Sequence, residues 1–74
     1  MVLNAYRIDG IVDEEYTGGF PVRNGESFIA VAKSMESAIV LTRSALARDR
    51  KSFISLEAVE VKLIGRVTTI EIEG

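Results

Sequence analysis

The sequence contains no cysteine, no histidine and no tryptophan, and it has a single proline among its 74 residues. Without cysteine there is no disulfide framework and no thiolate site, and without histidine the usual ligand sets for zinc, haem and copper cannot be assembled. General acid–base catalysis near neutral pH also loses its commonest side chain. We therefore expect a protein that is not an enzyme, and we predict no cofactor and no metal.

Long apolar runs are also missing, since no stretch of the sequence approaches the ~20 residues that a membrane-spanning helix needs. The opening residues have neither the charged start nor the apolar segment of a secretory signal. We therefore expect no membrane contact and a cytoplasmic location.

A chain of 74 residues lies close to the lower limit for one hydrophobic core. Such domains usually gain stability from disulfides, metals or a second subunit, and only the last is open to this sequence. The apolar fraction of 47% and the charged fraction of 27% are typical of a globular protein. We predict one α+β domain over residues 1–74, reinforced as a homo-oligomer. The net charge of −2 favours a protein partner over nucleic acid.

The first third of the chain is predicted to form a strand and a long loop. Residues 2–12 alternate between two faces, one of them richer in apolar side chains, which indicates a strand. Residues 13–25 combine an acidic run, a glycine pair, a proline and Asn24-Gly25, all of which interrupt regular structure. Because Asn and Gly tolerate positive φ, we also expect a tight hairpin there that pairs residues 20–23 with residues 26–29.

The middle of the chain predicts a strand followed by a helix. Residues 27–33 are apolar on both faces, which is typical of a central strand covered on both sides. Ser34 suits a helix N-cap, and Glu36 suits the positive end of the helix dipole. Basic residues then favour a helix end near Asp49. The predicted core-facing arc of this helix consists of Met35, Ala38, Ile39, Leu41, Thr42, Ala45 and Leu46.

The last third predicts a second hairpin. Residues 53–64 are rich in β-branched side chains, but their apolar alternation changes phase, and a β-bulge near residues 57–59 would explain this. Gly65-Arg66 suits a two-residue turn with positive φ at glycine, and residues 67–73 alternate like a final strand. The predicted order is ββαββ, an antiparallel four-stranded sheet with one helix packed on one face.

Two regions are candidates for binding a partner. The loop over residues 13–25 holds Tyr16, Phe20 and Val22, and exposed aromatic side chains are typical of binding hot spots. In the alternative interpretation, Phe20 folds back to cover an edge of a thin core. One helix can shield only one face of the sheet, so apolar side chains on the other face remain for a partner. The candidates of this second region are Ile29, Val31 and Val40, the last on the outer side of the helix.

A basic cluster near the predicted helix end allows two interpretations. A patch of this kind can contact phosphates or an acidic protein surface. Complementation of the helix dipole, together with solubility, explains the same residues without any ligand. The cluster consists of Arg43, Arg48, Arg50 and Lys51.

Two segments are similar in layout to small ribosomal proteins of the LX type. They are Tyr6-Arg7-Ile8-Asp9-Gly10, an opening strand, and Ala32-Lys33-Ser34-Met35-Glu36-Ser37-Ala38, a strand-to-helix junction. The resemblance implies association with RNA or the ribosome. The chain departs from those proteins in charge, because it has 9 basic and 11 acidic residues.

The sequence thus predicts a non-catalytic protein-interaction module of the adaptor or inhibitor type, similar in character to many phage or plasmid accessory proteins. We expect it to bind a protein partner through an uncovered sheet face or through the 13–25 loop. The alternative is an RNA- or ribosome-associated protein that uses the basic residues at the helix end. A third hypothesis is an enzyme subunit or small-ligand binder whose site is completed by another chain.

Overall fold

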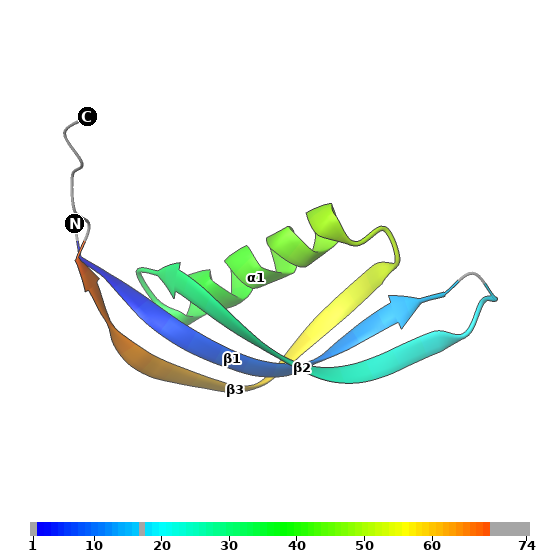
Figure 1. Cartoon of the computed structure of the whole chain (residues 1–74), viewed down its shortest axis with the longest axis horizontal. Helices are drawn as coiled ribbons and strands as arrows, with labels where there is room; N and C mark the ends of the chain where they lie inside the picture. The colour runs from blue at the N-terminus through cyan, green and yellow to red at the C-terminus, as the bar shows by residue number, and fades with distance from the viewer. Residues whose placement is uncertain (1, 17, 69–74) are drawn as a thin grey trace.

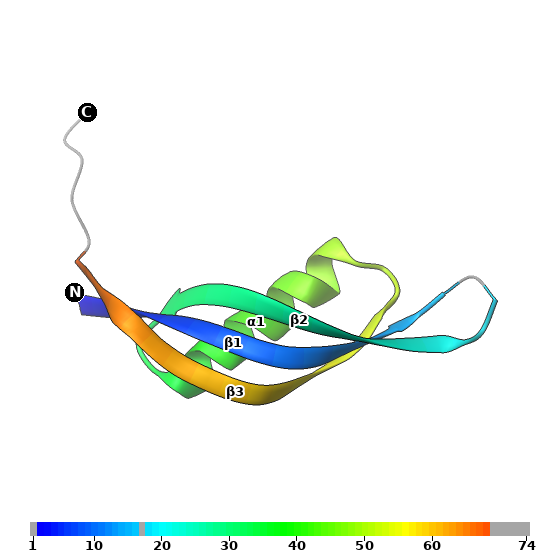
Figure 2. The ribbon, with the colours of Figure 1, turned by 60° about the horizontal axis from the view of Figure 1, so that its bottom comes forward.

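The computed structural model describes residues 2–16 and 18–68 of the chain. This described part forms a small α+β fold with three strands, β1 (Val2–Glu15), β2 (Pro21–Ala32) and β3 (Phe53–Thr68), and one helix, α1 (Met35–Asp49). The three strands are antiparallel and lie in the order β2-β1-β3, so that β1 is central (Figures 1 and 2). The order along the chain is ββαβ, and the prediction of ββαββ with four strands is wrong.

The sheet is strongly curved, and α1 lies on its concave side (Figure 1). The side chains of β1 that point toward the helix supply the centre of the core, because Ile8 and Val12 are fully buried. One cluster joins Ile8 with residues near the start of the helix, and a second joins Val12 with residues near its end. The buried members of the two clusters are Tyr6, Ile8, Ala32, Ala38, Val12, Leu46 and Leu56. The described helix is too short and too polar to cross a membrane.

The helix follows its prediction at both ends. The Ser34 side chain accepts a hydrogen bond from the backbone N–H of Ser37, as an N-cap should, and the helix ends at Asp49. Its buried stripe is narrower than predicted, consisting of Ala38, Thr42 and Leu46 at a spacing of four residues. Met35 and Leu41 were predicted in the core arc, but both are exposed. A sheet of three strands is too narrow to cover the whole predicted arc of the helix, so Met35 and Leu41 at the edges of the arc remain exposed.

The predicted loop over residues 13–25 is mostly strand. β1 continues to Glu15, β2 begins at Pro21, and Asn24-Gly25 pair with Val12 and Ile11 inside the ladder. The positive φ that the connection needs is supplied instead by Gly19, at 78°, the one positive φ among the described residues. The predicted Asn-Gly hairpin is therefore wrong. Continuous pairing with the long central strand outweighs the local turn preference of Asn24-Gly25.

The second predicted hairpin is also a single strand. Gly65 and Arg66 pair with Ala5 and Asn4, so β3 runs through the predicted turn to Thr68. The bulge expected near residues 57–59 is confirmed, because the register skips Val59. Two more skipped residues, Ile54 and Ile64, lie five positions to either side. The extra residue Val59 explains the phase change, because it lets the apolar side chains before and after it point to the same face of the sheet. Residues 69–73 of the predicted last strand lie outside the described residues.

The strand predicted to be central is an edge strand. β2 pairs with β1 on one side, and no other described strand pairs with it on the other. Phe28, Ala30 and Ala32 point toward the helix, as their pairing with the inward side chains of β1 requires. The opposite face of β2 carries Ile29 and Val31, which are 71% and 42% exposed. The apolar character of both faces therefore reflects surface without cover inside this chain, and not a central position.

Candidate protein-interaction edge

An open groove lies between the edge strand β2 and helix α1. Phe28 and Ala30 line it from the strand, and Leu41 and Ala45 line it from the helix. A second hollow shares Val31 and Leu41 with the first and continues toward the start of the helix. We call the two hollows together the β2 groove. Its other lining residues are Leu3, Ile29, Ala32, Lys33, Glu36, Ser37, Val40, Thr42, Leu46, Asp49 and Arg50.

The groove is open because of how the helix sits on the sheet. The helix contacts the sheet through the stripe of Ala38, Thr42 and Leu46, which places the neighbouring stripe of Leu41 and Ala45 beside the edge of β2. Small side chains at Ala30 and Ala45 leave space between the two elements. Leu41 is 52% exposed as a result, so its large apolar side chain is available for contact with a partner.

The β2 edge has none of the devices that usually block edge strands at residues 27–32. This segment, Ser-Phe-Ile-Ala-Val-Ala, carries no charge and no proline, and its pairing with β1 shows no register shift. Natural proteins usually protect an exposed edge with charges, prolines or bulges, because free backbone groups attract another strand. Residues 27–32 of β2 therefore have no charge, proline or bulge that would hinder pairing with a strand from outside this chain.

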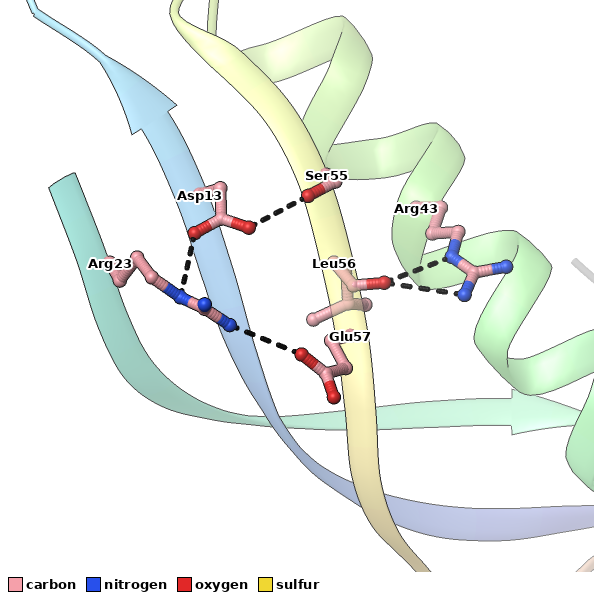
Figure 3. A network of polar contacts seen from close by, with 6 residues as sticks. All are labelled: Asp13, Arg23, Arg43, Ser55, Leu56 and Glu57. Atoms are coloured by element: carbon pink, nitrogen blue, oxygen red, sulfur yellow. Dashed lines mark hydrogen bonds and ion pairs between the residues drawn. The ribbon is translucent and has the colours of Figure 1, made fainter. Parts of the chain in front are cut away.

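The β3 edge is protected by bulges and charges, the two devices that residues 27–32 of β2 lack besides proline. Its pairing is broken by three bulges, and charged residues are spread along it at Glu57, Glu60, Lys62 and Arg66. In addition, the Arg43 guanidinium donates hydrogen bonds of 3.3 and 3.2 Å to the backbone carbonyl of Leu56 (Figure 3). That carbonyl is already satisfied, and an incoming strand would have to displace an arginine to reach it.

The convex face of the sheet is less apolar than predicted, because polar networks cross its middle. Arg23 on β2 contacts Asp13 at 3.1 Å and Glu57 at 3.2 Å, and the Ser55 hydroxyl donates to Asp13 (Figure 3). These contacts tie all three strands together. The predicted uncovered face is thus reduced to its apolar end next to β2.

A second convex network surrounds Asp9. The hydroxyl of Ser27 donates to this carboxylate, and Arg7 pairs with it at 3.2 Å. The hydrogen bond from Ser27, assisted by Arg7, lowers the pKa of Asp9 below its ordinary value. These polar groups satisfy one another and offer no apolar contact to a partner.

Two of the four predicted basic residues, Arg43 and Arg50, donate hydrogen bonds within the protein, and a third, Arg48, forms an exposed ion pair. Arg43 binds the Leu56 carbonyl, and Arg48 lies 3.7 Å from Asp49. Arg50 donates to the carboxylates of Glu14 and Glu26, with two bonds of 2.8 Å to the latter. These contacts lower the pKa of Glu26 and raise that of Arg50. Lys51 is exposed in the turn after the helix.

The predicted partner-binding residues fall into two separate places. Ile29, Val31 and Val40 border the β2 groove. Tyr16 and Phe20 lie at the β1–β2 connection, and Val22 follows on β2 opposite Glu14. Phe20 is 76% exposed, so it does not fold back over the core. Sequence reasoning missed Leu41, Ala45 and Phe28 as groove residues, although the uncharged run over residues 27–32 was a usable signal.

Comparison with known proteins yields no relative: no family model matches the chain, and neither a curated protein nor a solved structure matches it. The similarity in layout to small ribosomal proteins of the LX type therefore has no family match behind it.

Proposed function

We propose that this protein is a non-catalytic interaction module that binds an extended segment of a protein partner along the edge of β2. The observation that carries the proposal is the uncharged, unbulged edge over residues 27–32, placed beside an apolar groove. In this mode of recognition an added strand gains main-chain hydrogen bonds from the edge, and alternate side chains enter neighbouring pockets.

The β2 groove supplies both parts of that recognition. Backbone groups on the outer side of β2 provide the ladder, while Leu41 and Ala45 form the wall against which the side chains of an added strand would pack. Ile29 and Val31 provide apolar contacts on the convex face. A strand that pairs with β2 would therefore pack against Leu41 and Ala45 on the helix side and lie beside Ile29 and Val31 on the convex face.

The proposal is tested by selecting extended peptides from a phage-displayed random library against the wild-type protein. We expect the selected peptides to alternate apolar and polar residues, and to shift amide NMR signals along β2 and at Leu41 and Ala45. Val31→Lys should weaken their binding by at least about tenfold, which corresponds to about 1.4 kcal/mol. The matched control Val59→Lys, at a bulge of β3, should leave the affinity unchanged.

Two results would contradict the proposal. One is a selection that yields no binding peptide from a protein that sediments as a monomer, in which the β2 edge is free. The other is a set of peptides whose signal changes are confined to the connection that carries Tyr16 and Phe20.

The alternative of RNA binding has less support, because Arg43 and Arg50 are engaged with acceptors of the same chain. Contacts with phosphates would have to compete with these interactions. A nucleic-acid shift assay at low and physiological salt separates the two functions, since binding to phosphates weakens steeply as salt rises. We expect no shift at physiological salt, and a persistent one would favour the RNA alternative.

A further inference from the structure

We infer that the strand added to β2 is the β2 strand of a second copy of this chain, paired antiparallel about a two-fold axis at Ala30. This inference rests on the proposed function, because it names the partner of the same edge. It joins two three-stranded sheets into one six-stranded sheet with both helices on the same face.

The register follows from the sequence of the edge itself. Two residues that oppose each other in an antiparallel pair point to the same face of the sheet. A two-fold axis between two copies of β2 must therefore pass between the two copies of one residue, and the choice of that residue sets the register. With the axis at Ala30, the five apolar residues 28–32 oppose only one another. Ile29 lies opposite Val31 of the second copy, and Phe28 lies opposite Ala32, which joins a large side chain to a small one. Such apolar cross-strand pairs stabilise a sheet.

The neighbouring registers are worse in charge or in packing. An axis at Phe28 places Arg23 opposite Lys33 of the second copy, so that like charges face each other twice. An axis at Ile29 places Glu26 opposite Ala32, and an axis at Val31 places Lys33 opposite Ile29. Each of these brings a charge against an apolar side chain, and only the axis at Ala30 avoids both faults.

The ends of the β2 groove are also compatible with an antiparallel partner. Lys33 and Glu36 line the end near the start of the helix, while Asp49 and Arg50 line the other end. The two-fold axis brings the Lys33 end of one copy beside the Asp49 end of the other. Arg50 is paired with Glu14 and Glu26, and Arg48 with Asp49, so Lys33 meets no unpaired arginine at this end of the groove.

The two edges of the sheet make this assembly stop at two copies. A pairing of β2 with itself is isologous and closes at two copies, whereas a pairing of β2 with β3 of another copy is heterologous and builds larger rings or open filaments. The bulges of β3 and the bond from Arg43 to Leu56 oppose the second arrangement. The expected particle is therefore a dimer of 8.1 kDa chains, with no larger species.

The experiment is disulfide trapping, for which the absence of native cysteine leaves a clean background. In the proposed register the two copies of residue 30 face each other at a Cα separation of about 4.5–5.5 Å, which a disulfide spans. Ala30→Cys should therefore form a covalent dimer rapidly under mild oxidation. The matched control Lys33→Cys should not, because its two copies lie about 20 Å apart along the strands. Wild-type protein should sediment as a dimer at micromolar concentration.

The outcomes separate this inference from the function on which it rests. A wild-type monomer that still binds selected peptides along β2 overturns the second copy as partner and leaves the proposed function standing. A monomer that binds no peptide overturns both. A dimer that is trapped through Lys33→Cys but not through Ala30→Cys overturns the register. Ala30→Cys protein that keeps its wild-type circular dichroism and sediments as a dimer, yet does not cross-link, also overturns it.

Discussion

β2 and β3 flank the same central strand, yet they meet solvent in different ways. β3 is broken by three bulges, carries charges along its length and has the Leu56 carbonyl covered by Arg43. β2 is regular, and its residues 27–32 carry no charge. Both edges expose large apolar side chains to a similar extent, 71% for Ile29 and 66% for Val59. Exposure of apolar side chains alone therefore does not identify an interface. The two edges differ instead in their bulges, their charges and the covered carbonyl of Leu56.

The largest effect on stability should come from Gly10, which lets β3 lie close to β1 beside the Val59 bulge. A Cβ atom at Gly10 would lie 2.6 Å from the Glu57 carbonyl oxygen and 2.9 Å from Leu56 Cδ1. Because the nearer atom belongs to the backbone, Gly10→Ala should lower the free energy of unfolding by about 1–3 kcal/mol, measured by denaturant titration. On the β2 side, Gly25, which pairs with Ile11, has no atom within 4 Å of the Cβ position. Gly25→Ala should therefore change the free energy of unfolding by no more than about 0.5 kcal/mol. Equal losses in the two variants would contradict the claim that β1 and β3 are packed more closely at Gly10 than β1 and β2 are at Gly25.

The next effect concerns Arg50, which fixes the far end of the β2 groove. Its guanidinium joins Glu14 on β1 to Glu26 on β2, and Glu14 is buried. Arg50→Ala leaves the Glu14 carboxylate without this donor, and we expect a loss of about 1–2 kcal/mol after allowance for partial solvent exposure. Arg48→Ala is the control, because Arg48 and its partner Asp49 are both exposed. Its loss should stay below about 0.5 kcal/mol, and thermal unfolding of both variants tests the difference.

A smaller effect should appear in acid. Arg50 holds the pKa of Glu26 below its ordinary value of 4.5. The unfolded chain therefore binds more protons than the folded one in this range, and the contribution of Glu26 is full above pH 4.5. It is lost as the pH falls through the lower folded-state value. Glu26→Gln should flatten the decline of stability with falling pH, followed by denaturant titrations across the acid range. If Arg50 is the cause, the same substitution in Arg50→Ala protein should change the slope little.

The helix could be predicted closely from the sequence, because its signals are local. Ser34 caps its first turn, and the basic residues after Arg43 mark its end. The bulge at Val59 could also be predicted, since an extra residue shifts the apolar phase within a single strand. Both signals involve residues close together in the chain.

The turns and the strand order could not be predicted in the same way. Asn24-Gly25 and Gly65-Arg66 have the composition of hairpin turns, yet both pairs lie within strands that follow the long template of β1. The two apolar faces of residues 27–33 predict a central strand, but β2 is an edge strand. Apolar residues on both faces of a strand indicate that both faces can be buried. They do not show whether the burying residues belong to the same chain or to another. The same ambiguity turns this wrong prediction into the main evidence for a partner.

The most direct test compares one lysine placed on each edge. Ile29→Lys and Val59→Lys replace two exposed apolar side chains by the same charge, so neither removes a buried contact within the protomer. Sedimentation at micromolar concentration should show a dimer for the wild type and for Val59→Lys, and a monomer with unchanged circular dichroism for Ile29→Lys. An Ile29→Lys variant that remains dimeric, or a Val59→Lys variant that dissociates, would contradict the assignment of association to the β2 edge.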